Sequence, residues 1–174
     1  MRTLLIAAIA TLNLCVCAIA QAPAWEADFS QPGAAESYRD DDATQVSTAQ
    51  AGGVTVLTVT TPGVRPLEGV CIDIGPGLEG GRRYTARAHV RGLGVIWPML
   101  ISRNGWLYAR KTVTLTDAWQ EVWLTKPLDL QDDRMRLCIL TKEPNEVTMQ
   151  VRSAVAALEP APLTWDREAP PVRF

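Results

Sequence analysis

Hydrophobic and polar residues alternate with a period of two along most of the chain after residue 24. Such alternation predicts β-strands with one buried face. The clearest case is the segment 82–92, where apolar Tyr84, Ala86, Ala88 and Val90 alternate with Thr85, Arg87, His89 and Arg91. The segments that fit are 26–31, 44–50, 54–61, 67–74, 82–92, 95–102, 106–116, 119–126, 134–141 and 147–158. No segment predicts a helix of three turns.

Turn-forming residues separate these predicted strands. Examples are Gly52-Gly53, Thr61-Pro62-Gly63 and Asn104-Gly105. Asn104-Gly105 lies between two alternating segments and therefore predicts a tight β-hairpin.

Three later segments also divide into an inward and an outward face. In 106–116 the inward residues are Leu107, Ala109, Val113 and Leu115, opposite Trp106, Tyr108, Arg110, Thr112 and Thr114. In 134–141 they are Met135, Leu137 and Ile139, opposite Arg134, Arg136 and Cys138. In 147–158 they are Val147, Met149, Val151 and Val155, opposite Gln150 and Arg152. One apolar and one polar face per strand is typical of antiparallel sheets packed face to face. We therefore expect an all-β, antiparallel β-sandwich.

The first residues have the character of an export signal. Arg2 precedes an apolar run from Leu4 to Ala20, and Ala18-Ile19-Ala20 fits the small-x-small rule for cleavage. As a membrane anchor the run is slightly short, since a span takes about 20 residues, and no basic cluster follows it. We expect a signal peptide at 1–20, a sandwich domain at 21–160 and a proline-rich tail or linker at 161–174. The mature protein would then be secreted, periplasmic or in the cell envelope, with no membrane span.

Charge and cysteine content narrow the picture. The formal net charge of −2 argues against a nucleic-acid partner bound through bulk charge. Cys71 and Cys138 remain after cleavage, 67 residues apart, and an exported protein can oxidise them. A bond between them would stabilise the fold by about 3–4 kcal/mol. Two separate buried thiols are the alternative, because free cysteine packs as a small apolar residue.

Several short motifs resemble one family of binding modules. Gly81-Arg82-Arg83-Tyr84-Thr85-Ala86 resembles a "G-x-x-Y-x-hydrophobic" strand of carbohydrate-binding modules of families four and nine. Thr116-Asp117-Ala118-Trp119-Gln120-Glu121-Val122 resembles their "T-x-x-W-x-x-hydrophobic" strand, and Trp25-Glu26-Ala27-Asp28-Phe29 their first strand. The resemblance spans roughly 25–160 and implies a galactose-binding-domain-like jelly roll.

The same resemblance raises the question of a structural calcium. Modules of this kind often carry an aspartate pair in the last strand that helps to hold one. This chain has Arg152-Ser153-Ala154 there, so we carry over no calcium site and expect no cofactor. Trp119 resembles the family's structural tryptophan and is interpreted as a packing residue.

The residue types that catalysis needs do not form a recognisable constellation. His89 is the only histidine and lies on a polar strand face, and no Gly-x-Ser-x-Gly motif is present. The acidic runs 40–42 and 132–133 fall in predicted loops, where charged residues are normally solvated. We therefore expect a protein that is not an enzyme.

A binding site for sugar has better support. Trp106, Tyr108 and Arg110 occupy alternate positions on the outward face of one predicted strand. Aromatic rings can stack on the apolar face of a sugar, and a guanidinium group can bind its hydroxyl rim. Arg87 and His89 are possible neighbours. The alternative is that Trp106 lies beside the turn and covers the end of the sandwich, while Tyr108 packs against a neighbouring loop.

The outward faces also carry several arginines: Arg87, Arg91, Arg110, Arg134, Arg136 and Arg152. If several converged on one sheet, an acidic polysaccharide would suit them, because guanidinium groups bind carboxylates in bidentate fashion. A solvated charged surface is the alternative, since neighbouring strands of a jelly roll can belong to different sheets.

These observations predict a secreted, non-catalytic module that binds a poly- or oligosaccharide. The alternative function is that of a structural or protein-interaction sandwich, which would join partner domains in a larger secreted or envelope assembly.

Overall fold

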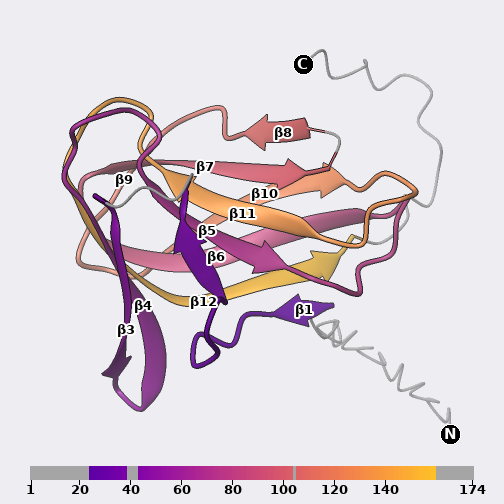
Figure 1. Cartoon of the computed structure of the whole chain (residues 1–174), viewed down its shortest axis with the longest axis horizontal. Coiled ribbons are helices and arrows are strands. Elements are labelled where there is room, and N and C mark those ends of the chain that lie inside the picture. The colour runs from indigo at the N-terminus through magenta and orange to yellow at the C-terminus, as the bar shows by residue number, and fades with distance from the viewer. Residues whose placement is uncertain (1–23, 39–42, 104, 160–174) are drawn as a thin grey trace, which may run out of the picture.

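The computed structural model describes residues 24–38, 43–103 and 105–159. The predicted signal peptide at 1–20 and the predicted tail at 161–174 lie outside these residues. The described chain forms two antiparallel sheets stacked as a sandwich and contains no α-helix, which confirms the all-β prediction (Figure 1). It likewise holds no helix with the length and apolarity to cross a membrane.

The first sheet contains six strands. Their order is β10 (Gln120–Pro127), β6 (Arg83–Leu93), β12 (Val147–Leu158), β4 (Val54–Thr61) and β3 (Gln45–Ala51), with β1 (Trp25–Glu26) also paired to β12. The β3–β4 hairpin extends beyond the other strands at one end of the molecule (Figure 1).

The second sheet also contains six strands. Their order is β2 (Ala35–Ser37), β5 (Gly69–Ile74), β11 (Met135–Leu140), β7 (Val95–Ser102) and β8 (Gly105–Tyr108), with β9 (Val113–Thr114) also paired to β7. The antiparallel β7–β8 pair confirms the predicted hairpin.

The main core fills the space between the two sheets. It is built from the inward residues that the alternation predicted, such as Ala86 and Val90 of β6 and Leu137 and Ile139 of β11, all fully buried. Burial of these apolar faces is the main force that holds the two layers together.

Two predicted strands are wrong in extent. The first ends at Glu26, because Asp28 accepts hydrogen bonds from the backbone and hydroxyl of Ser30 and turns the chain. These hydrogen bonds hold the pKa of the Asp28 carboxyl below its usual value. The second, 106–116, divides into β8 and β9, and residues 109–112 belong to neither strand.

Trp97 and Pro98 explain the division. Pro98 has no N–H to donate to a partner strand. The indole Nε1 of Trp97 donates to the carbonyl of Ala109 at 2.7 Å, and the Ala109 N–H donates to the carbonyl of Pro98 at 2.9 Å. The chain therefore loops away from β7 between Tyr108 and Val113, and Arg110 lies in that loop.

A β-bulge in β12 corrects a further prediction. The pairing of β12 with β6 shifts between Val151 and Ser153, so that Arg152 is an extra residue without a partner. A bulge reverses the alternation beyond it. Ala154 and Ala156 therefore point into the core, and Val155, which was predicted to point inward, lies opposite the outward Arg87.

Candidate functional site

Three aromatic side chains form a row on the outer face of the second sheet. The register pairs Met99 with Tyr108 and Ile101 with Trp106, which brings β8 alongside β7. Trp97 and Tyr108 stack with ring centroids 4.3 Å apart and an interplanar angle of 13°. Tyr108 and Trp106 lie 6.2 Å apart and are tilted by 50°. The structure thus places Trp106 and Tyr108 side by side on one face, and it adds Trp97 to the row.

The row is accessible at its Trp106 end. Trp106 is 57% exposed, whereas Trp97 and Tyr108 are half-buried. The ammonium of Lys142 lies 5.5 Å from the centroid of the Trp97 ring and contributes a cation–π contact. Neither ring is fully buried, so both Trp106 and Tyr108 keep exposed surface.

An apolar floor continues from the aromatic row across the same face. Cys71 of β5 and Cys138 of β11 are register partners and form a disulfide. Together with Met99 and Leu140 they make a second buried cluster, against which Tyr108 packs. Of the two states that the sequence left open for these cysteines, the structure shows the bonded one.

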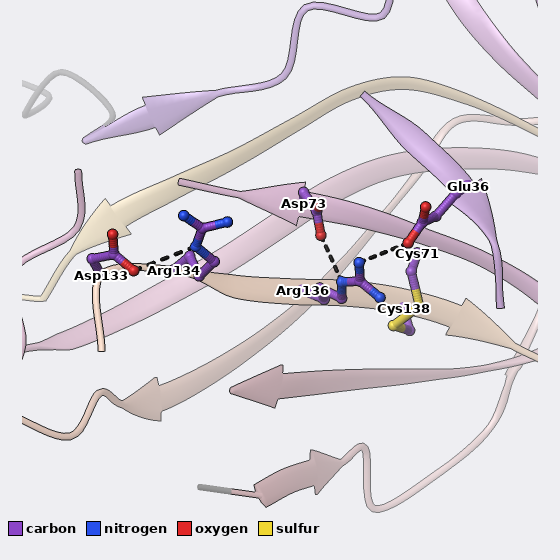
Figure 2. A network of polar contacts seen from close by, with 7 residues as sticks. All are labelled: Glu36, Cys71, Asp73, Asp133, Arg134, Arg136 and Cys138. Carbon is purple, nitrogen blue, oxygen red and sulfur yellow. Dashed lines mark hydrogen bonds and ion pairs between the residues drawn. A yellow bond between two sulfur atoms is a disulfide. The ribbon is translucent and has the colours of Figure 1, made fainter. Parts of the chain in front are cut away.

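An ion-pair network borders this floor. Arg136 of β11 contacts Glu36 of β2 and Asp73 of β5, each at 2.7 Å (Figure 2). Next along the chain, Arg134 pairs with Asp133 at 3.3 Å. The two carboxylates hold the Arg136 guanidinium in place beside the disulfide, as Figure 2 shows. A fixed charged group next to an apolar surface can serve as an oriented hydrogen-bond donor.

A pocket of about 480 Å³ opens at the end of this face. Ile101, the partner of Trp106, lines it together with Arg103, Arg134 and Arg136. Arg103 is exposed and makes no ion pair with another described residue. The volume falls within the range of about 300–1,000 Å³ that ligand pockets span.

Lys126 fixes the tip of the β7–β8 hairpin next to this pocket. Its Nζ donates to the hydroxyl of Ser102 and to the carbonyl of Gly105, each at 2.6 Å. Partial burial lowers the pKa of Lys126, and the nearby Asp129 and Asp132 oppose that effect. The ammonium thus ties β10 of the first sheet to the hairpin that carries Trp106.

The remaining predicted site residues lie elsewhere. Arg110 is exposed in the loop after β8 and is not in line with Trp106 and Tyr108, because β8 ends at Tyr108. Arg87 and His89 point outward from β6, which belongs to the first sheet. The prediction that Arg87 and His89 are neighbours of Trp106 is therefore wrong, because they lie on the other sheet.

Arg87 and His89 have their own partners on that opposite face. Arg87 and His89 contact Glu121 of β10 at 3.6 and 3.8 Å, and His89 Nδ1 lies 3.1 Å from the hydroxyl of Ser153. In the part of the chain that the structure describes, no group of three or more His, Cys, Asp or Glu residues could hold a metal ion.

Sequence reasoning missed part of this site. Trp97 was not among the predicted site residues, although its alternation with Met99 was an available signal. Glu36 and Asp73 gave no signal, because they approach Arg136 only through the pairing of β2, β5 and β11.

Comparison with known proteins bears on the fold. No protein-family model and no curated protein matches the sequence. Among solved structures, the CBM22-1 xylan-binding domain of Paenibacillus barcinonensis Xyn10C is similar over 82% of this chain and 99% of that one, with a TM-score of 0.60 and 13% identity. The family 11 carbohydrate-binding module of Clostridium thermocellum Lic26A-Cel5E is similar over 79% and 95%, with a TM-score of 0.58 and 12% identity.

The fold is that of carbohydrate-binding modules. It is a jelly-roll sandwich, as the motifs implied. The chain also spans 26% of a longer structure, the CBM22-1–GH10 modules of C. thermocellum xylanase 10B in complex with xylohexaose, with a TM-score of 0.58 and 14% identity. At these identities the likeness concerns the fold alone.

Proposed function

We propose that this protein is a non-catalytic carbohydrate-binding module whose ligand lies on the outer face of the second sheet. The observation that carries the proposal is the row of Trp97, Tyr108 and Trp106, of which Trp106 is 57% exposed. Its register partner Ile101 lines the adjoining pocket. Exposed aromatic rings beside fixed polar groups suit a sugar, whose ring has an apolar face and a hydroxyl rim.

The roles of the individual side chains follow from their positions. Trp106 offers its ring for stacking, and the Trp97–Tyr108 pair extends the platform. Arg103 and Arg136 donate hydrogen bonds to hydroxyl groups in the adjoining pocket. Arg110, exposed in the loop after β8, would contact a longer chain. The xylan-binding modules of the same fold make β-linked xylan the first ligand to test.

Export and family placement belong to the same proposal. A disulfide between Cys71 and Cys138 is compatible with an oxidising compartment, which supports secretion, or retention in the periplasm or envelope, after removal of residues 1–20. The closer relationship to families four and nine remains a prediction.

Affinity electrophoresis through gels that contain neutral polysaccharides tests the binding site. The wild type should be retarded by at least one of xylan, mixed-linkage β-glucan or galactomannan. Trp106→Ala should weaken that binding by at least about fivefold, which corresponds to about 1 kcal/mol for one aromatic contact.

Trp123→Ala is the matched control. Trp123 is 60% exposed, like Trp106, but it points outward from β10 of the first sheet. It should leave retardation unchanged. A wild type that migrates freely through every gel, or an equal loss in both variants, would contradict the proposed site and favour a protein-interaction role.

A further inference from the structure

A separate pocket of about 360 Å³ lies on the outer side of the first sheet. Its charged lining consists of Arg91 of β6 and Arg152 of the β12 bulge, and Trp119 also lines it. The remaining lining comes from the β3–β4 hairpin: Ala51, Gly52, Val54 and Val56. No carboxylate contributes to it.

Two positive charges share one aromatic ring in this pocket. The guanidinium carbon of Arg91 lies 4.6 Å from the centroid of the Trp119 ring, and that of Arg152 lies 4.9 Å from it. The two charges are therefore closer together than the Debye length of about 10 Å at 0.1 M salt, and they repel each other. The cation–π contacts orient both groups but do not neutralise them.

Two other arginines of the sheets, Arg87 and Arg136, differ in this respect. Arg87 has Glu121 within ion-pair distance, and Arg136 has both Glu36 and Asp73. Arg91 and Arg152 have no carboxylate within 4.0 Å among the described residues. An anion in the pocket would therefore meet two guanidinium groups that no acidic side chain already occupies.

Local structure holds both arginines toward the pocket. Gln150 Oε1 accepts hydrogen bonds from Nε and Nη2 of Arg91, at 2.9 and 2.7 Å, which leaves Nη1 available. Arg152 is the extra residue of the bulge, and bulges often redirect a side chain beside a binding site. Val56, only 1% exposed although it points outward, gives the pocket an apolar floor.

We infer that this pocket is a second binding site, which takes an anionic sugar such as a uronic acid residue of an acidic polysaccharide. The two guanidinium groups bind the carboxylate, and Trp119 and the exposed Val54 contact the apolar part of the sugar ring. The site shares no residue with the proposed site for neutral glycans and lies on the other sheet.

Affinity electrophoresis against polygalacturonate, with neutral galactan in a parallel gel, tests this inference. The wild type should be retarded by polygalacturonate, and Arg152→Gln should bind about tenfold more weakly, as expected for the loss of one charge-assisted hydrogen bond. Arg152 is exposed, so its substitution should leave the fold and the circular dichroism spectrum unchanged.

Arg83→Gln is the matched control. Arg83 is exposed on the same strand as Arg91, lies outside the pocket and has no carboxylate within ion-pair distance among the described residues. It should alter the affinity by no more than about twofold. An equal loss of affinity for polygalacturonate in Arg83→Gln and Arg152→Gln would show that binding depends only on the total positive charge of the protein. That result would overturn the inference.

A third gel contains a sulfated galactan, because sulfate could supply the same charge. Retardation by polygalacturonate that exceeds retardation by the sulfated polymer supports a uronate site. Retardation by the sulfated polymer alone, or by neither polymer, overturns it. Binding to neutral xylan tests the proposed site on the second sheet. Its result is therefore separate from the outcome for the acidic polymers.

Discussion

Glu68 shows how one buried side chain shapes the surroundings of the proposed glycan site. It is 1% exposed, and its two carboxylate oxygens accept hydrogen bonds from the backbone N–H groups of Gly63 and Arg65 at 2.9 and 3.1 Å. The loop that it closes ends at Leu67, which packs against the disulfide cluster. A buried carboxylate is tolerated here because backbone donors satisfy it.

Replacement of Glu68 should therefore destabilise the protein. Glu68→Ala leaves two backbone donors without their acceptor and should lower the free energy of unfolding by about 2–3 kcal/mol. Glu68→Gln keeps one acceptor oxygen and should lose less. Urea denaturation of both variants measures the effect, with Glu79→Ala, at an exposed glutamate, as the control. A Glu68→Ala variant as stable as the control would contradict this role.

At the scale of strands, alternation predicted most of the architecture. It failed where a local contact outweighed the pattern. The Trp97 indole and Pro98 interrupt the pairing of β7, which divides one predicted strand into β8 and β9. The extra Arg152 reverses the phase of β12. The pattern of hydrophobic residues does not reveal the divided strand or the bulge, because both depend on how two segments of the chain pair with each other.

The Cys71–Cys138 disulfide joins two adjacent strands, β5 and β11, of the second sheet. Its sequence separation of 67 residues means that it closes a long loop in the unfolded chain. The double variant Cys71→Ala/Cys138→Ala should lower the free energy of unfolding by about 3–4 kcal/mol.

Guanidinium denaturation with and without a reductant measures this contribution. The reduced wild type should approach the stability of the double variant, and reductant should not affect the variant itself. Equal stability of the oxidised wild type and the double variant would show that the bond does not constrain the fold.

At the scale of the whole molecule, the sandwich separates two kinds of surface. The second sheet carries aromatic rings over an apolar floor, and the first sheet carries Arg91 and Arg152 around Trp119. The alternation in the sequence showed for most positions, though not for Val155, which side chains point outward. It could not show to which of the two sheets each strand belongs. That assignment depends on the chain topology, which places β6 in the first sheet and β7 in the second. Arg87 and His89 were therefore grouped with residues of the opposite face.

This separation predicts that the two proposed sites act independently. Stacked sheets pack about 10 Å apart, and substitutions at such distances with no shared partner usually have additive effects. Trp106→Ala should weaken binding to neutral glycan and leave binding to polygalacturonate unchanged, and Arg152→Gln should do the reverse. In the double variant each affinity should equal that of the corresponding single variant. Calorimetric titration of all four proteins with both ligands measures this, and a loss of polygalacturonate binding in Trp106→Ala would mean that both polymers occupy one face.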